Sequence, residues 1–273
     1  MILFFLKKLL LWRLTAKGFK LVTQEYLDRE LHFAAVGRQR LRWILGQSGL
    51  SKSFSAHDIE TILNHSKSQL GQDVLALSVV GASRKGYFVE FGATDGVSLS
   101  NTHLLEKRFG WQGLLCEPAR GWHSDLMKNR SAELDWRCVH TNSDLMVDFL
   151  ETKLPELSTM RGFGTDDMHA PVREDNEAYE VETVSLLDLL KSHSAPKHID
   201  FMSIDTEGSE FEILNAFDFN QYSFGTITVE HNYTSNREKV RTLLLSKGYR
   251  QVYPELSDFD DWFVPRTNQN IPG

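Results

Sequence analysis

The chain has 273 residues, of which 41% are hydrophobic and 25% charged, the balance of an ordinary soluble globular protein. This composition excludes a collagen-like, low-complexity or wholly disordered chain. The net charge of -7 argues against nucleic acid as the main partner, because binding to phosphates generally needs a basic surface. Two cysteines, Cys116 and Cys138, are too few for a disulfide framework or a cysteine-rich zinc site, and they favour a cytoplasmic location.

The charge is unevenly distributed along the chain. Residues 1–56 contain ten Lys and Arg residues against three acidic ones, whereas the rest contains 20 against 34. This basic segment opens with MILFFLKKLLLWRL, whose apolar runs are interrupted by charges, so we expect neither a membrane-spanning helix nor a signal peptide here. We expect a helical extension that packs on the domain or on a second subunit. An interfacial helix on the membrane surface, which would make the protein peripheral to the membrane, is the alternative.

The remaining elements are predicted in chain order. Residues 19–48 have a helical pattern, and a Ser- and Gly-rich stretch places a domain boundary near residue 56, which leaves 57–273 as the main domain. A helix is predicted from Asp58 to about Val80. The polar stretch 151–182 shows no clear elements and is interpreted as an insertion on the substrate side.

Short apolar runs then alternate with helical segments from residue 87 onward. Strands are predicted over 87–93, 113–117, 136–140, 198–205, 224–230, 249–253 and 261–265. Strands that alternate with helices of about ten residues are typical of a parallel sheet covered on both faces. The sequence therefore predicts an α/β fold with seven strands, mostly parallel, and helices on both sides.

Ligands of such sheets bind at the carboxyl ends of the strands, so the residues at those ends are candidates for a site. The first strand ends in EFGATDG, where Gly92 and Gly96 allow a tight turn. The glycine spacing differs from the dinucleotide fingerprint, and Glu90 and Asp95 would repel a pyrophosphate. A positively charged cofactor such as S-adenosylmethionine suits this turn better. Glu117 ends the second strand and can accept hydrogen bonds from the ribose hydroxyls of an adenosine cofactor.

The fourth strand ends in DTEGSE, which places several acids at the same edge. Ser209 and Glu212 are predicted to form a capping box for the next helix. Asp205 and Glu207 have no such structural explanation. The fifth strand ends in Glu230 and His231, and His231 is expected to face the same cleft as Asp205.

Five segments of the chain together resemble the FkbM family of methyltransferases. They are SQLGQD (68–73), VEFGATDGVSLSNT (89–102), LLCEP (114–118), FMSIDTEGSEFEIL (201–214) and ITVEHN (227–232). The resemblance covers about residues 66–265 and implies a class I, Rossmann-like methyltransferase that uses S-adenosylmethionine. With the turn residues included, it implies a cofactor site formed by Glu90, Gly92, Ala93, Asp95, Gly96, Asn101, Thr102, Glu117 and Asp205.

The expected reaction is methyl transfer to a hydroxyl oxygen of a sugar, a glycan or another polyhydroxylated small molecule. An alcohol is a weak nucleophile and needs a base, for which Asp205, His231 and Glu230 are the candidates. A divalent metal held by Asp205, Glu207 and Glu230 is a weaker alternative. Two other functions remain open from the residues: an NAD-dependent oxidoreductase, and a non-catalytic binding module on the same fold.

Overall fold

The computed structural model describes residues 37, 39–46, 50–165, 169–269 and 271. The chain divides into two compact units, Met1–Arg40 and Leu41–Gly273, and the fold below is that of the second. The predictions for residues 1–36, including the interfacial helix, lie outside the described residues. No helix in the described part of the chain is long and apolar enough to cross a lipid bilayer.

The centre of the fold is a seven-stranded sheet with the strand order β12-β13-β11-β9-β1-β2-β3. Its strands are β1 (Tyr87–Phe91), β2 (Gln112–Cys116), β3 (Glu133–Asp135), β9 (Phe201–Ile204), β11 (Ile227–Glu230), β12 (Tyr249–Val252) and β13 (Asp260–Pro265). Strands β11, β9, β1, β2 and β3 are parallel, and only β13 runs antiparallel to its two neighbours. The structure thus confirms the predicted seven-stranded, mostly parallel sheet.

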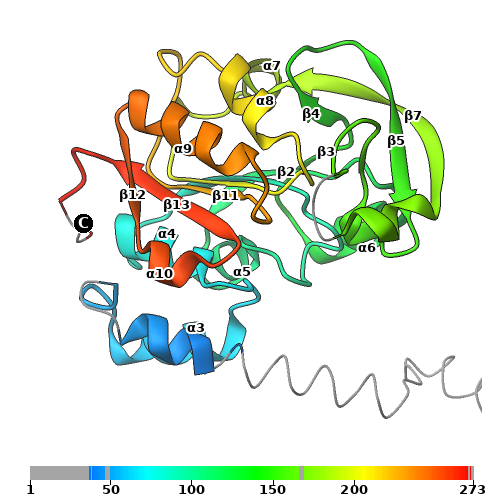
Figure 1. Cartoon of the computed structure of the whole chain (residues 1–273). Helices are drawn as coiled ribbons and strands as arrows, with labels where there is room; N and C mark the ends of the chain where they lie inside the picture. Colours follow the sequence, from blue (N-terminus) through cyan, green and yellow to red (C-terminus); the bar gives the residue numbers. More distant parts are fainter. Residues whose placement is uncertain (1–36, 38, 47–49, 166–168, 270, 272–273) are drawn as a thin grey trace, which may run out of the picture. The chain divides into compact units, whose positions relative to one another are not determined.

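Helices cover both faces of this sheet (Figure 1). One face packs against α7 (Leu186–Ser192), α8 (Glu210–Ala216) and α9 (Asn236–Ser246). The other packs against α3 (Ala56–His65), α4 (Gln72–Val80), α5 (His103–Phe109), α6 (His123–Asn129) and α10 (Pro254–Ser257). Successive residues of the strands alternate between the two cores, because side chains alternate across a strand: Val89 belongs to the first core and Phe88 to the second. Burial on both faces explains why these strands are continuous apolar runs.

A second sheet of four strands, in the order β4-β7-β5-β6, follows β3 in the chain. It comprises β4 (Cys138–His140), β5 (Met146–Thr152), β6 (Thr159–Met160) and β7 (Asn176–Ser185), and a separate pair consists of β8 (His198–Ile199) and β10 (Ser223–Phe224). The 3₁₀ helices are η1 (Arg120–Trp122), η2 (Pro155–Leu157) and η3 (Ala170–Glu174). The prediction that residues 151–182 lack clear elements is therefore wrong. This stretch was hard to identify because much of β7 is solvent-exposed and polar.

Two further predictions about the secondary structure differ from the structure. The third strand of the central sheet is Glu133–Asp135, whereas Cys138–His140 pairs with β7 in the second sheet. The single helix expected over 58–80 is two helices, because Gly71 has a φ of +89° and begins α4 as its N-cap. The buried carboxylate of Asp73 holds the intervening turn by accepting hydrogen bonds from the hydroxyls of Ser66 (2.6 Å) and Ser68 (2.7 Å).

The capping box expected between Ser209 and Glu212 is also absent. Ser209 makes no side-chain cap, and its hydroxyl donates instead to the hydroxyl of Thr206 (2.9 Å). Glu210 organises this turn: its Oε1 accepts from the backbone N–H groups of Thr206 (3.0 Å) and Gly208 (2.9 Å).

The predicted boundary near residue 56 divides a segment that packs within the second unit. Leu41, Ile44, Leu45 and Leu50 are buried in the core that also contains α4. The hydroxyl of Ser78 donates to the carbonyl of Leu50 (2.6 Å). Residues 41–46 and 50 therefore contribute to the stability of the domain that carries the site.

Candidate active site

The loops that follow β1, β2, β9 and β11 lie at one edge of the sheet, because these four strands are parallel neighbours. Non-glycine residues with positive φ are concentrated in these loops, namely Thr94 (49°), Leu99 (60°), Glu207 (58°), Asn232 (41°) and Tyr233 (58°). Such backbone conformations cost free energy and gather where a binding site constrains the chain. The edge predicted from the sequence is therefore also the strained edge of the molecule.

The backbone N–H groups of the turn after β1 already donate hydrogen bonds within the protein. The N–H groups of Gly92 and Ala93 donate to the carbonyl of Cys116 at 3.0 and 3.3 Å, and that of Gly96 donates to Ala93 at 2.9 Å. The N–H of Thr94 donates to Glu117 Oε2 at 2.7 Å. A dinucleotide turn instead offers free N–H groups to a pyrophosphate. The geometry of this turn is therefore unsuited to a phosphate ligand and compatible with a cationic one.

Gly92 also fixes the distance between β1 and β9. Its φ is +74°, and a Cβ at this position would lie 2.2 Å from the carbonyl oxygen of Asp205. Only glycine allows this approach. The close contact places the β1 turn directly beside the loop that carries Asp205.

Two of the acids expected to contact the cofactor are engaged within their own loops. Glu90 is buried and accepts hydrogen bonds from the backbone N–H of Asn101 (2.6 Å) and from the hydroxyl of Thr102 (2.5 Å). The Oδ1 atom of Asp95 accepts from the N–H groups of Val97 (2.8 Å) and Ser98 (2.7 Å). Both residues therefore shape the loop between β1 and α5.

Arg130, at the C-terminal end of α6, completes this loop, and nothing in the sequence pattern identified it. Its guanidinium contacts Glu106 (2.7 Å) and lies 3.7 Å from Glu90, with both carboxylates buried. It also donates to the carbonyl of Gly96 (3.1 Å) and the hydroxyl of Thr102 (2.8 Å).

Glu117 and Asn101 have the acceptor capacity that an adenosine cofactor needs. The two carboxylate oxygens of Glu117 accept one hydrogen bond each, from Thr94 N–H and from Ala119 N–H (2.8 Å). A carboxylate has about four acceptor positions, so it can accept further donors such as ribose hydroxyls. The side-chain amide of Asn101 donates to Ser203 (2.9 Å), while its buried Oδ1 has no hydrogen-bond partner. Such an orphaned acceptor fits a donor group on a ligand, so these residues fit S-adenosylmethionine.

The second sheet is attached to the loop that follows Glu117. The carboxylate of Glu151, on β5, accepts from the N–H groups of Arg120 and Gly121, both at 3.1 Å, and from the hydroxyl of Tyr179. The guanidinium of Arg120 lies over the ring of Tyr179, 4.0 Å from its centroid. The insertion therefore helps to position the loop that follows Glu117.

The opposite side of the site is a partly buried carboxyl pair. Asp205 and Glu230, at the ends of β9 and β11, share a hydrogen bond. Burial raises the pKa of Asp205 to about 6. Burial, followed by the nearby charge of Asp205, raises the pKa of Glu230 well above its ordinary value, which favours a proton held within this pair. The side-chain amide of Asn232 donates to Glu230 at 2.8 Å.

Glu207 extends this acidic group and pairs with a cation from the insertion. Oxygen atoms of Asp205, Glu207 and Glu230 all lie within 4.8 Å of one another, the arrangement required by the metal alternative. Glu207 forms a buried ion pair with Arg173. Arg173 therefore places a positive charge beside Glu207 in this acidic group.

Asp260 and Gln72 also belong to this edge of the sheet, and neither was predicted as a site residue from the sequence. Asp260, at the start of β13, is paired in register with Glu230. Its Oδ2 accepts from the amide of Gln72 at 2.6 Å, and burial raises its pKa to about 7. Because β13 is antiparallel, its first residue lies at the edge where parallel strands end. Gln72 lies within the SQLGQD segment, so that resemblance was the available signal.

His231 does not join Asp205 as expected. Its Nδ1 accepts from the N–H of Tyr233 (3.0 Å), and its Nε2 lies 3.7 Å from Asp261. Asp261 is engaged by Arg237 at 2.8 Å. Burial lowers the pKa of His231. The structure therefore brings Asp205 together with Glu230, and it places His231 beside Asp261.

Comparison with known proteins gives one family and several distant folds. The model of the methyltransferase FkbM domain matches residues 90–251. Among solved structures, a precorrin-6y C5,15-methyltransferase from Geobacter metallireducens GS-15 is 12% identical, with a TM-score of 0.38, 66% of this chain and 71% of that chain being covered. The CurJ carbon methyltransferase is 10% identical, with a TM-score of 0.34, and the match covers 90% of this chain and 71% of that chain. No curated protein matches the sequence significantly.

Proposed function

The chain belongs to the FkbM methyltransferase domain family, and on this premise we propose that it methylates a hydroxyl oxygen of a sugar, glycan or other polyhydroxylated small molecule. The family match favours this function over the oxidoreductase, as does the β1 turn, whose N–H groups are already engaged. The observation that carries the choice of a hydroxyl acceptor is the Asp205–Glu230 carboxyl pair.

The proposed chemistry follows from that pair. When bound, S-adenosylmethionine supplies a methyl group made electrophilic by a sulfonium. Asp205 accepts the proton of the acceptor hydroxyl while the oxygen forms a bond to the methyl carbon and the bond from that carbon to sulfur breaks. With a pKa of about 6, Asp205 is ionised at neutral pH and still basic enough to take the proton. Glu230 holds Asp205 in place, and the loops position the reactants in line.

Calorimetric titration with S-adenosylhomocysteine tests the cofactor assignment, and we expect saturable binding. Incubation with S-adenosylmethionine and a mixture of methyl glycosides then tests the acceptor class. Mass spectrometry is expected to find one product heavier by a methylene group. Absence of S-adenosylhomocysteine binding would overturn the cofactor assignment, and a product methylated on nitrogen or carbon would overturn the hydroxyl acceptor. Cofactor binding without turnover on any acceptor would favour the non-catalytic module.

We expect the affinity for S-adenosylhomocysteine to fall as the pH is lowered through about 7. Burial, with smaller contributions from the carboxylates of Asp205 and Glu151, raises the pKa of Glu117 to about 7, although the hydrogen bonds from the N–H groups of Ala119 and Thr94 act to lower it. Ribose hydroxyls donate to the ionised carboxylate, so binding favours the form that exists above this pKa. Affinity is then highest above pH 7 and falls by up to about tenfold for each pH unit below it.

Calorimetry across neutral pH measures this dependence, with Glu117→Gln as the control. The variant is expected to bind more weakly above pH 7 and to lose most of the pH dependence, because its amide does not titrate. If the variant retained the pH dependence of the native protein, the ribose role of Glu117 would be refuted.

A further inference from the structure

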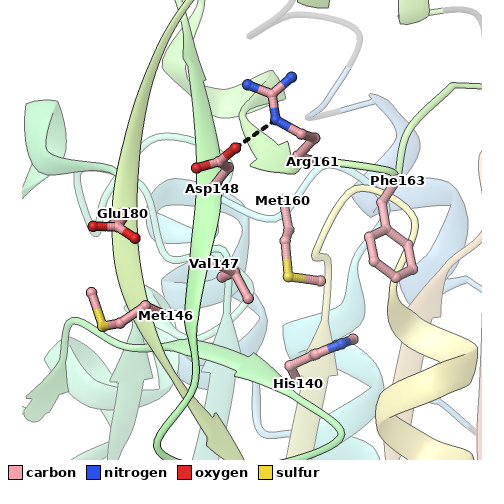
Figure 2. A pocket seen from close by; sticks show the side chains of 8 residues that line it. All are labelled: His140, Met146, Val147, Asp148, Met160, Arg161, Phe163 and Glu180. Carbon is pink, nitrogen blue, oxygen red and sulfur yellow. Dashed lines mark hydrogen bonds and ion pairs between the residues drawn. The ribbon is translucent and has the colours of Figure 1, made fainter.

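The second sheet contains a pocket of about 460 Å³ that lies apart from the residues assigned above (Figure 2). Its lining comes from the four strands and from the turn after β6: His140, Met146, Val147, Asp148, Met160, Arg161, Phe163 and Glu180. This volume is in the range of small-molecule sites.

The wall of the pocket is fixed to the loop that follows Asp205. Next to Met160, the hydroxyl of Thr159 donates to the carbonyl of Glu207 at 3.0 Å. A Cβ at Gly208 would lie 3.5 Å from Phe163 Cβ, so the turn that carries Phe163 packs directly on the acidic loop. The wall of the pocket therefore contacts the loop that follows the proposed base.

The chemistry of the lining selects among ligand classes. Four of the lining side chains are apolar: Val147, Met160 and Phe163 lie on one side of β5 in Figure 2, and Met146 lies on the other side, beside Glu180. The only arginine of the lining, Arg161, is paired with Asp148 (2.8 Å), and Glu180 is opposite Asp148 in the strand register. A second carboxylate next to a neutralised arginine disfavours a phosphate or another anion. Burial lowers the pKa of His140, so this side chain adds no positive charge at neutral pH.

A neutral polyhydroxylated ring matches this lining. Carboxylates and a guanidinium hydrogen-bond strongly to hydroxyl groups, and the C–H faces of a sugar ring pack against apolar and aromatic side chains. We propose that this pocket binds a saccharide unit of the methyl acceptor and so determines which acceptor reaches Asp205. This inference rests on the proposed function and names the substrate class of the same enzyme.

Saturation-transfer NMR with a panel of methyl glycosides of the common hexoses, deoxyhexoses and N-acetylhexosamines tests the proposal, with S-adenosylhomocysteine present. Met146→Trp enlarges a lining side chain that is 58% exposed, and Met127→Trp, at 59% exposure on α6, is its matched control. Asp148→Asn removes a lining carboxylate, and Asp175→Asn changes the exposed carboxylate of the Lys153–Asp175 pair, which does not line the pocket.

We expect at least one glycoside to bind the native protein. Its dissociation constant should rise at least about tenfold in Met146→Trp and in Asp148→Asn and should stay unchanged in the two controls. All four variants are expected to bind S-adenosylhomocysteine normally. If no glycoside bound the native protein, or if a glycoside bound Met146→Trp as well as the native protein, the pocket assignment would be overturned. The proposed methyltransferase function would stand in either case. Loss of S-adenosylhomocysteine binding by the native protein would overturn the proposed function itself.

Discussion

Replacement of Asp205 by Asn is expected to lower turnover by roughly 10²–10⁴-fold, the usual contribution of a general base. The substitution keeps the shape of the side chain and removes the group that takes the proton. Asp205 is held by a hydrogen bond from Glu230 and by the backbone contact with Gly92, so the amide should occupy the same place. The affinity for S-adenosylhomocysteine should change little, which calorimetry measures alongside turnover.

His231→Gln is the informative comparison, because His231 is the other base suggested by the sequence. Its imidazole lies beside Asp261 and Tyr233, so we expect turnover to stay close to that of the native enzyme. A loss in His231→Gln that matched Asp205→Asn would return the role of base to His231. If cofactor affinity fell in step with turnover in Asp205→Asn, Asp205 would be a cofactor ligand instead.

A chelator distinguishes catalysis that depends on a metal ion from catalysis by Asp205 as a general base. Turnover by a metal held by Asp205, Glu207 and Glu230 would be abolished by EDTA and restored by Mg²⁺ or Ca²⁺. With Arg173 and a shared proton balancing these acids, we expect turnover to be unaffected by EDTA.

The parts of the site that could be predicted from the sequence are those determined by strand ends. Asp205, Glu117 and the β1 turn follow buried apolar runs, and the carboxyl ends of parallel strands share one edge. Strand periodicity places such residues at the edge without any knowledge of distant contacts. It does not tell whether a carboxylate such as Glu90 faces a ligand or a neighbouring loop.

The parts that could not be predicted depend on partners distant in the chain. Gln72 reaches Asp260 across 188 positions, and Arg173 reaches Glu207 from a polar segment with no recognisable pattern. His231 was placed correctly at the strand end but in the wrong surroundings. Its ring lies beside Asp261, whereas Glu230, the preceding residue, is bonded to Asp205, because adjacent positions point to opposite sides.

Arg130→Met is expected to destabilise the fold by about 3–5 kcal/mol, the cost of leaving buried carboxylates without their cation. The side chain of Arg130 is fully buried, and its partners Glu106 and Glu90 are 8% and 4% exposed. Methionine replaces the apolar stem and supplies no charge. Urea unfolding at neutral pH measures the loss, and Arg241→Met, whose partner Glu238 is mostly exposed, should cost at most about 1 kcal/mol.

The pH dependence of this loss distinguishes a charge effect from a packing effect. Burial alone would raise the pKa of Glu106, but Arg130 together with the hydrogen bonds from Lys107 and Ser131 lowers it below its ordinary value of 4.5. A carboxylate with a lowered pKa stabilises the fold above its unfolded pKa, and this contribution is lost as the pH falls through the folded value. The difference in the free energy of unfolding between the native protein and Arg130→Met should therefore be largest at neutral pH and should become smaller below about pH 4.5. A difference that did not change with pH would assign Arg130 a packing role, and the loop between β1 and α5 would then owe its position to Glu90 and its backbone partners alone.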